Sequence, residues 1–60
     1  MNERVSIEFY TANDVSVMLG VSRATAYRII DKLNSELEEE KYIIISGKIS
    51  KKYFDERLYI

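Results

Sequence analysis

The segment from residue 14 to residue 30 constrains the fold more than any other, because it carries the local signals of two helices separated by a sharp turn. Gly20 is placed to form that turn, since glycine adopts positive φ angles without the steric cost that other residues meet. Ser22 follows as a helix N-cap, because its hydroxyl can accept a hydrogen bond from an unpaired amide in the first turn of a new helix. We therefore predict two helices that meet at Gly20.

The second helix is predicted to run from Arg23 to about Glu39, since no proline interrupts it and its residues favour helix. At about 100° per residue, one arc of the helix is apolar and the opposite half is polar, cationic and aromatic. The apolar stripe comprises Ala26, Ile29, Ile30, Leu33 and Leu37. The other half carries Arg23, Ala24, Tyr27, Arg28, Asp31 and Lys32. We expect the stripe to face the core and the other half to face a partner.

Two elements are predicted before this helix. Apolar residues alternate at Val5, Ile7 and Phe9, which indicates a half-buried strand over residues 5–10. Thr11 and Asp14 then form a variant of the capping box and predict a first helix from Ala12 to Leu19. Its inward side is expected to carry Val15, Met18 and Leu19.

A hairpin and a final helix are predicted after it. Residues 42–46 have strong β-propensity, Gly47-Lys48 suits a two-residue turn, and Ile49-Ser50 would return as the second strand. Ser50 can cap a helix over residues 51–59, with Tyr53, Phe54 and Leu58 packing inward. The expected fold class is a single domain over residues 1–60, mainly α with a small β-hairpin or sheet.

The composition narrows the range of functions. The chain has no cysteine and no histidine, so it lacks thiolate metal ligands, the commonest metal ligand and the usual general base. A chain of 60 residues also has little room for a cleft. We expect no enzyme activity, no cofactor and no small-molecule effector. The longest aliphatic run, residues 43–45, is far short of a membrane span, and the N-terminus does not resemble a signal peptide, so we expect a cytoplasmic protein with no membrane partner.

The formal net charge of −1 argues mildly against a nucleic-acid partner, but the charges are unevenly distributed. Negative charge gathers at Glu36, Glu38, Glu39 and Glu40. Basic residues lie on either side of that cluster, at Arg23, Arg28, Lys32, Lys41, Lys48, Lys51 and Lys52. An acidic pole with basic surfaces elsewhere is compatible with binding a phosphate backbone on one side.

The segment around Gly20 resembles the helix-turn-helix of bacterial repressors, including the lac repressor type. The resemblance rests on Asp14-Val15-Ser16-x-x-x-Gly20-Val21-Ser22-x-x-Thr25-Ala26-x-Arg28-Ile29-Ile30. Ser16 departs from the alanine that is usual at this close contact between the two helices.

A broader resemblance is to the excisionase family of winged-helix proteins, which is related in fold to regulators of the mercury-resistance type. It is carried by residues 10–15 and 19–22, the Gly47-Lys48 turn and Lys51-Lys52-Tyr53-Phe54. The resemblance implies a winged helix-turn-helix that binds double-stranded DNA with its second helix in the major groove. It also implies binding at repeated sites and DNA bending in support of an integrase.

The same resemblance implies roles for individual residues. Arg23, Ala24 and Arg28 match positions that read base edges, Ser22 and Thr25 match positions that contact phosphate, and Lys48 would lie at the wing tip. Lys32 and Tyr27 complete the candidate DNA-binding set, although Tyr27 could instead pack against the N-terminal strand. Arginine suits the role because it can donate two parallel hydrogen bonds to guanine.

Two functions follow from the sequence. The first is a small sequence-specific DNA-binding protein of a phage or mobile element, either excisionase-like or a transcriptional regulator. Its partners would be double-stranded DNA and an integrase, or a second copy on an adjacent site. The alternative is a protein-interaction module that keeps the fold without binding DNA, which the acidic cluster at residues 36–40 favours.

Overall fold

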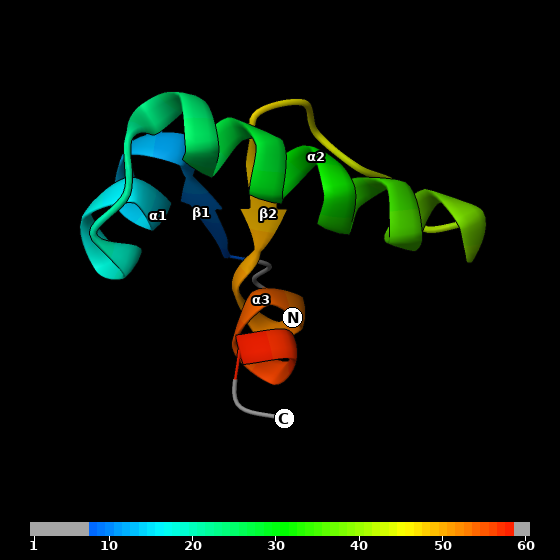
Figure 1. The fold of residues 1–60 in the computed structure, drawn as a ribbon. Coiled ribbons are helices and arrows are strands. Elements are labelled where there is room, and N and C mark those ends of the chain that lie inside the picture. The colour runs from blue at the N-terminus through cyan, green and yellow to red at the C-terminus, as the bar shows by residue number, and fades with distance from the viewer. Residues whose placement is uncertain (1–7, 59–60) are drawn as a thin grey trace.

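The computed structural model describes residues 8–58, which form three helices and a two-stranded sheet (Figure 1). The elements in chain order are β1 (Phe9–Thr11), α1 (Ala12–Leu19), α2 (Arg23–Glu39), β2 (Lys48–Ser50) and α3 (Lys51–Leu58). The predicted fold class is confirmed: the chain is mainly helical with a small antiparallel sheet. Within residues 8–58, no helix is long and apolar enough to cross a bilayer.

Local capping signals set the ends of α1 and α2 where the sequence predicts them. The Thr11 hydroxyl accepts from the Asp14 amide at 3.2 Å, and the Asp14 carboxylate accepts from the Thr11 amide at 3.0 Å, which completes the capping box. Gly20 ends α1 with φ of 69°, in the left-handed region. Ser22 then caps α2 by accepting from the Thr25 amide at 3.1 Å.

A different motif ends α2. The amides of Lys41 and Tyr42 donate to the carbonyls of Glu38 and Leu37 at 2.9 and 3.1 Å, which is the pattern of a Schellman motif. Lys41 takes the left-handed position of that motif, with φ of 72°. This position usually holds glycine, because a Cβ there crowds the backbone. The long helix is therefore capped at its acidic end despite an unfavourable residue.

The sheet differs from the predicted hairpin. β2 pairs antiparallel with β1, in the register Phe9 to Ser50, Tyr10 to Ile49 and Thr11 to Lys48. Residues 42–46 form no strand, and their only ladder contact is an isolated bridge from Ile45 to Lys48. The prediction failed because β-propensity reflects packing on a half-buried surface, whereas Ile43 is 93% exposed and has no such surface.

The first strand and the turn also need correction. β1 covers only the end of the predicted strand, while Val5 and Ile7 lie outside the described residues. The turn centres on Ser46 and Gly47, closed by the Lys48 amide donating to the Ile45 carbonyl at 3.0 Å. Gly47 has φ of 78°, which suits the third position of a type II turn. We call residues 45–48 the wing turn.

The core lies where α1, α2, β2 and α3 meet. Its buried residues are Ala12, Val15, Ala26, Ile30, Leu33, Ile49 and Phe54. The predicted inward positions are confirmed for Val15, Leu19, Tyr53 and Phe54, but Met18 and Leu58 are 44% and 43% exposed. Both lie in the last turn of eight-residue helices.

Candidate nucleic-acid interface

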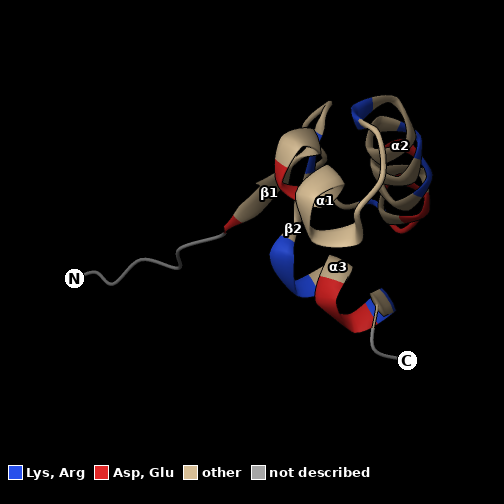
Figure 2. Cartoon of the chain, turned by 60° about the vertical axis from the view of Figure 1, so that its left-hand side comes forward, with Lys and Arg blue, Asp and Glu red and all other residues tan. Residues whose placement is uncertain are grey.

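The N-terminal half of α2 presents a row of cationic side chains. Arg23, Arg28 and Lys32 are all exposed, and none of them forms an ion pair with the part of the chain that the structure describes. Figure 2 shows Lys and Arg, in blue, where α2 begins. Ala24 is also exposed and lies in the same first turn. We call this face, formed by residues 23, 24, 28 and 32, the basic face of α2, although the exposed Asp31 lies on the same half of the helix.

The first turn of α2 also offers backbone donors. The Ser22 carbonyl accepts from the Ala26 amide at 2.9 Å, and the Ser22 hydroxyl takes the Thr25 amide, so the amides of Arg23 and Ala24 precede the intrahelical bonds. Such amides and the helix dipole favour an anion. The Ser22 hydroxyl itself is engaged, because it also donates to the Thr25 hydroxyl at 3.1 Å. A phosphate would therefore meet Thr25 and the open amides more readily than the Ser22 side chain.

Tyr27 has a partner that the sequence did not suggest. Its ring lies against the wing turn, where a methyl group on Gly47 would sit 3.5 Å from ring atom Cε1. The side chain remains 44% exposed. Tyr27 thus lies between the basic face of α2 and the wing turn.

Lys48 was predicted to lie at the wing tip, but it lies one residue past the tip. The tip is formed by Ser46 and Gly47, while Lys48 opens β2 and pairs with Thr11. The sequence-based placement was wrong because the turn is one residue earlier than Gly47-Lys48. The Lys48 side chain is exposed.

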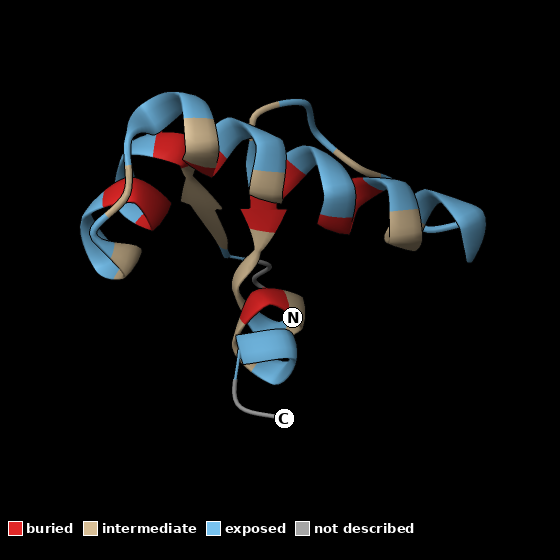
Figure 3. Cartoon of the chain, viewed as in Figure 1, coloured by how far each residue is buried: buried red, intermediate tan, exposed pale blue. Residues whose placement is uncertain are grey.

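These parts lie on one side of the molecule. Figure 3 shows the upper surface of α2 in the pale blue of exposed residues and the buried positions underneath. The segment that leads into β2 passes along the same upper side, whereas α3 lies below (Figure 1). The exposed surface of α2 and the segment that leads into β2 therefore lie on the side of the molecule away from α3.

Comparison with known proteins decides the family. The chain is similar to the ICEBs1 excisionase of Bacillus subtilis (strain 168), with 47% identity over 49 residues that span 82% of this chain and 77% of that protein. This chain belongs to the same excisionase family. No protein-family model and no solved structure matches it. The similarity covers far more of the excisionase-family chain than its helix-turn-helix alone.

The sequence pattern of this excisionase-family chain did not identify Asn34 as a residue that contacts the wing turn. Asn34 is only 4% exposed and donates through Nδ2 to the carbonyls of Lys48 and Ile45, at 3.0 and 3.3 Å. The available signal was a polar residue beside the apolar stripe, at an angle of about 20° on the wheel that begins at Arg23. Periodicity shows that such a residue borders the core but does not show what it binds.

The opposite end of the molecule uses its charges internally. Tyr53 donates to the Glu36 carboxylate at 2.7 Å, and Arg57 forms an ion pair with the same group. The Tyr53 hydrogen bond and the nearby Arg57 guanidinium lower the pKa of Glu36, and Lys32 adds a smaller attraction. These contacts tie α3 to the C-terminal half of α2.

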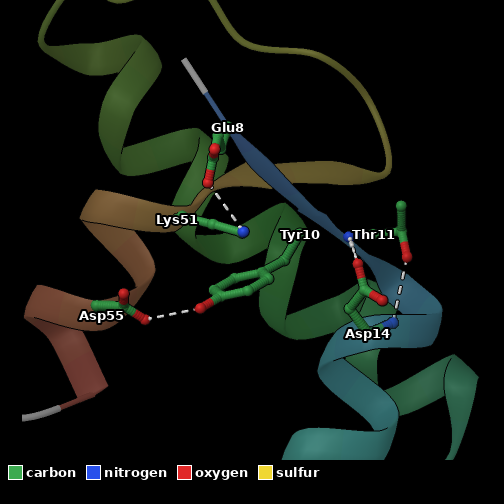
Figure 4. Close-up of polar contacts among 6 residues, drawn as sticks. All are labelled: Glu8, Tyr10, Thr11, Asp14, Lys51 and Asp55. Atoms are coloured by element: carbon green, nitrogen blue, oxygen red, sulfur yellow. Dashed lines mark hydrogen bonds and ion pairs between the residues drawn. The ribbon is translucent and has the colours of Figure 1, made fainter. Parts of the chain in front are cut away.

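A second set of polar contacts joins α3 to β1 and to Glu8, the residue before it (Figure 4). Lys51 pairs with Glu8 at 3.0 Å, and Tyr10 donates to Asp55 at 3.2 Å. The Glu8 hydrogen bond and charge raise the pKa of Lys51. Lys51 and Arg57 therefore serve α3 docking, in contrast to the cations of the basic face of α2.

Proposed function

We propose that this chain is a small double-stranded DNA-binding protein that promotes excision of a mobile element, with α2 in the major groove. The observation that carries the proposal is the 47% identity to the ICEBs1 excisionase over most of both chains. The helix-turn-helix geometry and the basic face of α2 support it. The resemblance to the lac repressor and mercury-resistance types is consistent with the same mode of binding.

In this proposal α2 enters the groove with its N-terminal half. An α-helix fits the major groove, and arginine at its exposed positions can donate to O6 and N7 of guanine. Arg28 and Arg23 would take that role, and the Ala24 methyl would contact a thymine methyl. Thr25, the open amides of the first turn and Lys32 would hold phosphate oxygens.

The acidic net charge does not oppose this arrangement. Phosphate attraction depends on local charge within about a Debye length, roughly 8–10 Å at physiological salt. The glutamates at residues 36–40 lie at the far end of a 17-residue helix from Arg23. At about 1.5 Å per residue, the centre of that cluster is some 20 Å from the first turn, so salt screens most of its repulsion.

We further propose that the chain acts with an integrase or with a second copy on an adjacent site. One small module buries too little surface for tight specific binding, which favours repeated sites. A transcriptional regulator would use the same interface and remains the related alternative. The acidic end of α2 and the exposed Tyr42 and Ile43 instead favour a second candidate, a protein-interaction module.

Selection of bound sequences from random duplexes tests the proposal. We expect a defined motif with repeated half-sites, together with a log K that falls linearly as log salt rises. Enrichment of no motif, combined with a flat salt dependence, would favour the interaction module. Enrichment of a single unrepeated site would favour the regulator over the excision role.

A further inference from the structure

The wing turn is held unevenly by backbone hydrogen bonds: Lys48 at its C-terminal side pairs with Thr11 in β1, whereas its N-terminal side is held weakly. Apart from the Lys48 to Ile45 hydrogen bond and the single bridge, no ladder within residues 8–58 supports residues 42–46. The neighbouring segment includes Ile43, which is almost fully exposed. What fixes the turn therefore comes from elsewhere in the fold.

Two side chains of α2 supply that support. Asn34 donates both of its described hydrogen bonds across the turn, to the carbonyls of residues 45 and 48. Tyr27 covers Gly47 from the preceding part of the helix. The two residues are seven positions apart, so they lie on nearly the same side of α2, between the buried stripe and the side that carries Ala24, Arg28 and Lys32.

Burying an amide is costly unless its hydrogen bonds are satisfied. An apolar side chain of similar size would fill the same space but would not fix the direction of the two carbonyls. The amide instead sets both the position and the orientation of the turn that leads into Lys48. The lysine follows the turn directly and is exposed.

We propose that Asn34, assisted by Tyr27, is a positioning residue that holds the wing turn so that Lys48 contacts the same duplex as the basic face of α2. This inference rests on the proposed function. It gives Asn34 a role in DNA binding although its side chain is buried and touches no nucleic acid. The role is exerted through Lys48.

A double-mutant cycle between Asn34 and Lys48 tests the inference in the full chain. Each variant is titrated with a selected duplex over a range of salt concentrations. In the otherwise wild-type chain, Lys48→Ala should reduce the magnitude of the slope of log K against log salt by about 1, where K is the association constant. This is the effect of losing one phosphate contact. Asn34→Leu should produce the same drop, and Lys48→Ala should then have no further effect. Ser35→Ala, an exposed neighbour on α2, is the matched control and should leave the slope unchanged.

A second variant covers the case in which Asn34→Leu does not fold. Gly47→Ala strains the turn at its positive φ without altering α2, and it should remove the effect of Lys48→Ala in the same way. Faster hydrogen exchange at the Lys48 amide in either variant would report the loosened turn without DNA.

The outcomes separate the two proposals. If the wild type shows no salt-dependent binding to any duplex, the proposed function is wrong and this inference fails with it. If the wild type binds but Lys48→Ala has no effect, or has the same effect with and without Asn34, only the positioning role is overturned. If Asn34 had only a structural role, Asn34→Leu would lower the stability of the fold and leave the effect of Lys48→Ala on DNA binding intact.

Discussion

The two halves of α2 use charge in opposite ways. In the N-terminal half, Arg23, Arg28 and Lys32 project from the fold and form no ion pair within residues 8–58. In the C-terminal half, Glu36 binds Tyr53 and Arg57 and joins the helix to α3. The difference shows that a helix packed on the core along its length can use its charged side chains within the fold at one end and leave them exposed at the other.

The contrast predicts that damage to α3 is structural. Phe54 is buried and packs edge-on against Tyr10, with ring centroids 5.4 Å apart. Phe54→Ala should lower the free energy of unfolding by about 3–5 kcal/mol, which is comparable with the total stability of so small a domain. Urea denaturation followed by circular dichroism measures it. Lys52→Ala, an exposed change on the same helix, should stay within about 0.5 kcal/mol of the wild type. A stable Phe54→Ala variant would mean that α3 is not part of the core.

Substitution of an arginine in the N-terminal half of α2 and of the α3 arginine that pairs with its C-terminal half should separate binding from stability. Arg28→Ala should weaken binding to a selected site by about 1–3 kcal/mol, or about 5- to 150-fold, because a bidentate base contact is lost. Its unfolding midpoint should not change. Arg57→Ala removes the same charge from α3, so it should lower the midpoint slightly and leave affinity nearly unchanged.

Fluorescence anisotropy on both variants, with thermal melts in parallel, makes this comparison. Equal losses of affinity would point to net charge as the cause and would remove the distinction between the two halves. Retention of sequence discrimination by Arg28→Ala would place base recognition on another residue.

Replacement of Lys41, which follows the end of α2, by glycine should raise the stability of the fold. Lys41 occupies a left-handed conformation that disfavours any side chain with a Cβ. Lys41→Gly should therefore raise the free energy of unfolding by about 1 kcal/mol, as measured by urea denaturation. Lys41→Ala removes the charge without glycine's conformational freedom and should give no such gain. Equal behaviour of the two variants would show that the charge, not the backbone, governs this position.

The smallest expected effect is the pH dependence of the α2–α3 contact. The pKa of Glu36 is lowered from 4.5, first by the Tyr53 hydrogen bond and then by the attraction of Arg57. A carboxyl group with a lowered pKa stabilises the fold above its unfolded-state value and loses that contribution as the pH falls through the folded-state value. Glu36→Gln should therefore lower the thermal midpoint at neutral pH, and the difference should vanish well below pH 4.5. A difference that persisted in acid would argue against the charge of Glu36 as its source.

The sequence predicted those parts of the fold that local signals specify. Thr11, Gly20 and Ser22 act on their immediate neighbours, so the bounds of α1 and α2 agree with the structure. Strand pairing was not predictable in the same way, because the β-propensity of residues 42–46 does not identify a partner. In the structure, β2 pairs with the N-terminal strand β1 instead.

The candidate site shows the same division. Exposure of Arg28 and Lys32 followed from helical periodicity, which places them opposite the buried stripe, whereas Arg23 is exposed at the first position of α2. The contacts of Tyr27 and Asn34 with the wing turn depend on where a distant segment returns to α2. Periodicity cannot supply that information, and the turn preference of Gly47-Lys48 placed the turn one residue too late.

Backbone amide chemical shifts during titration with duplex DNA test the central claim most directly. We predict that resonances of residues 22–32 and of the wing turn move with added duplex, and that the movement weakens as salt is raised. Resonances of α3 should stay in place. Shifts confined to residues 36–43 and α3, or no shifts at all, would contradict the assignment of the N-terminal half of α2 as the DNA-binding face.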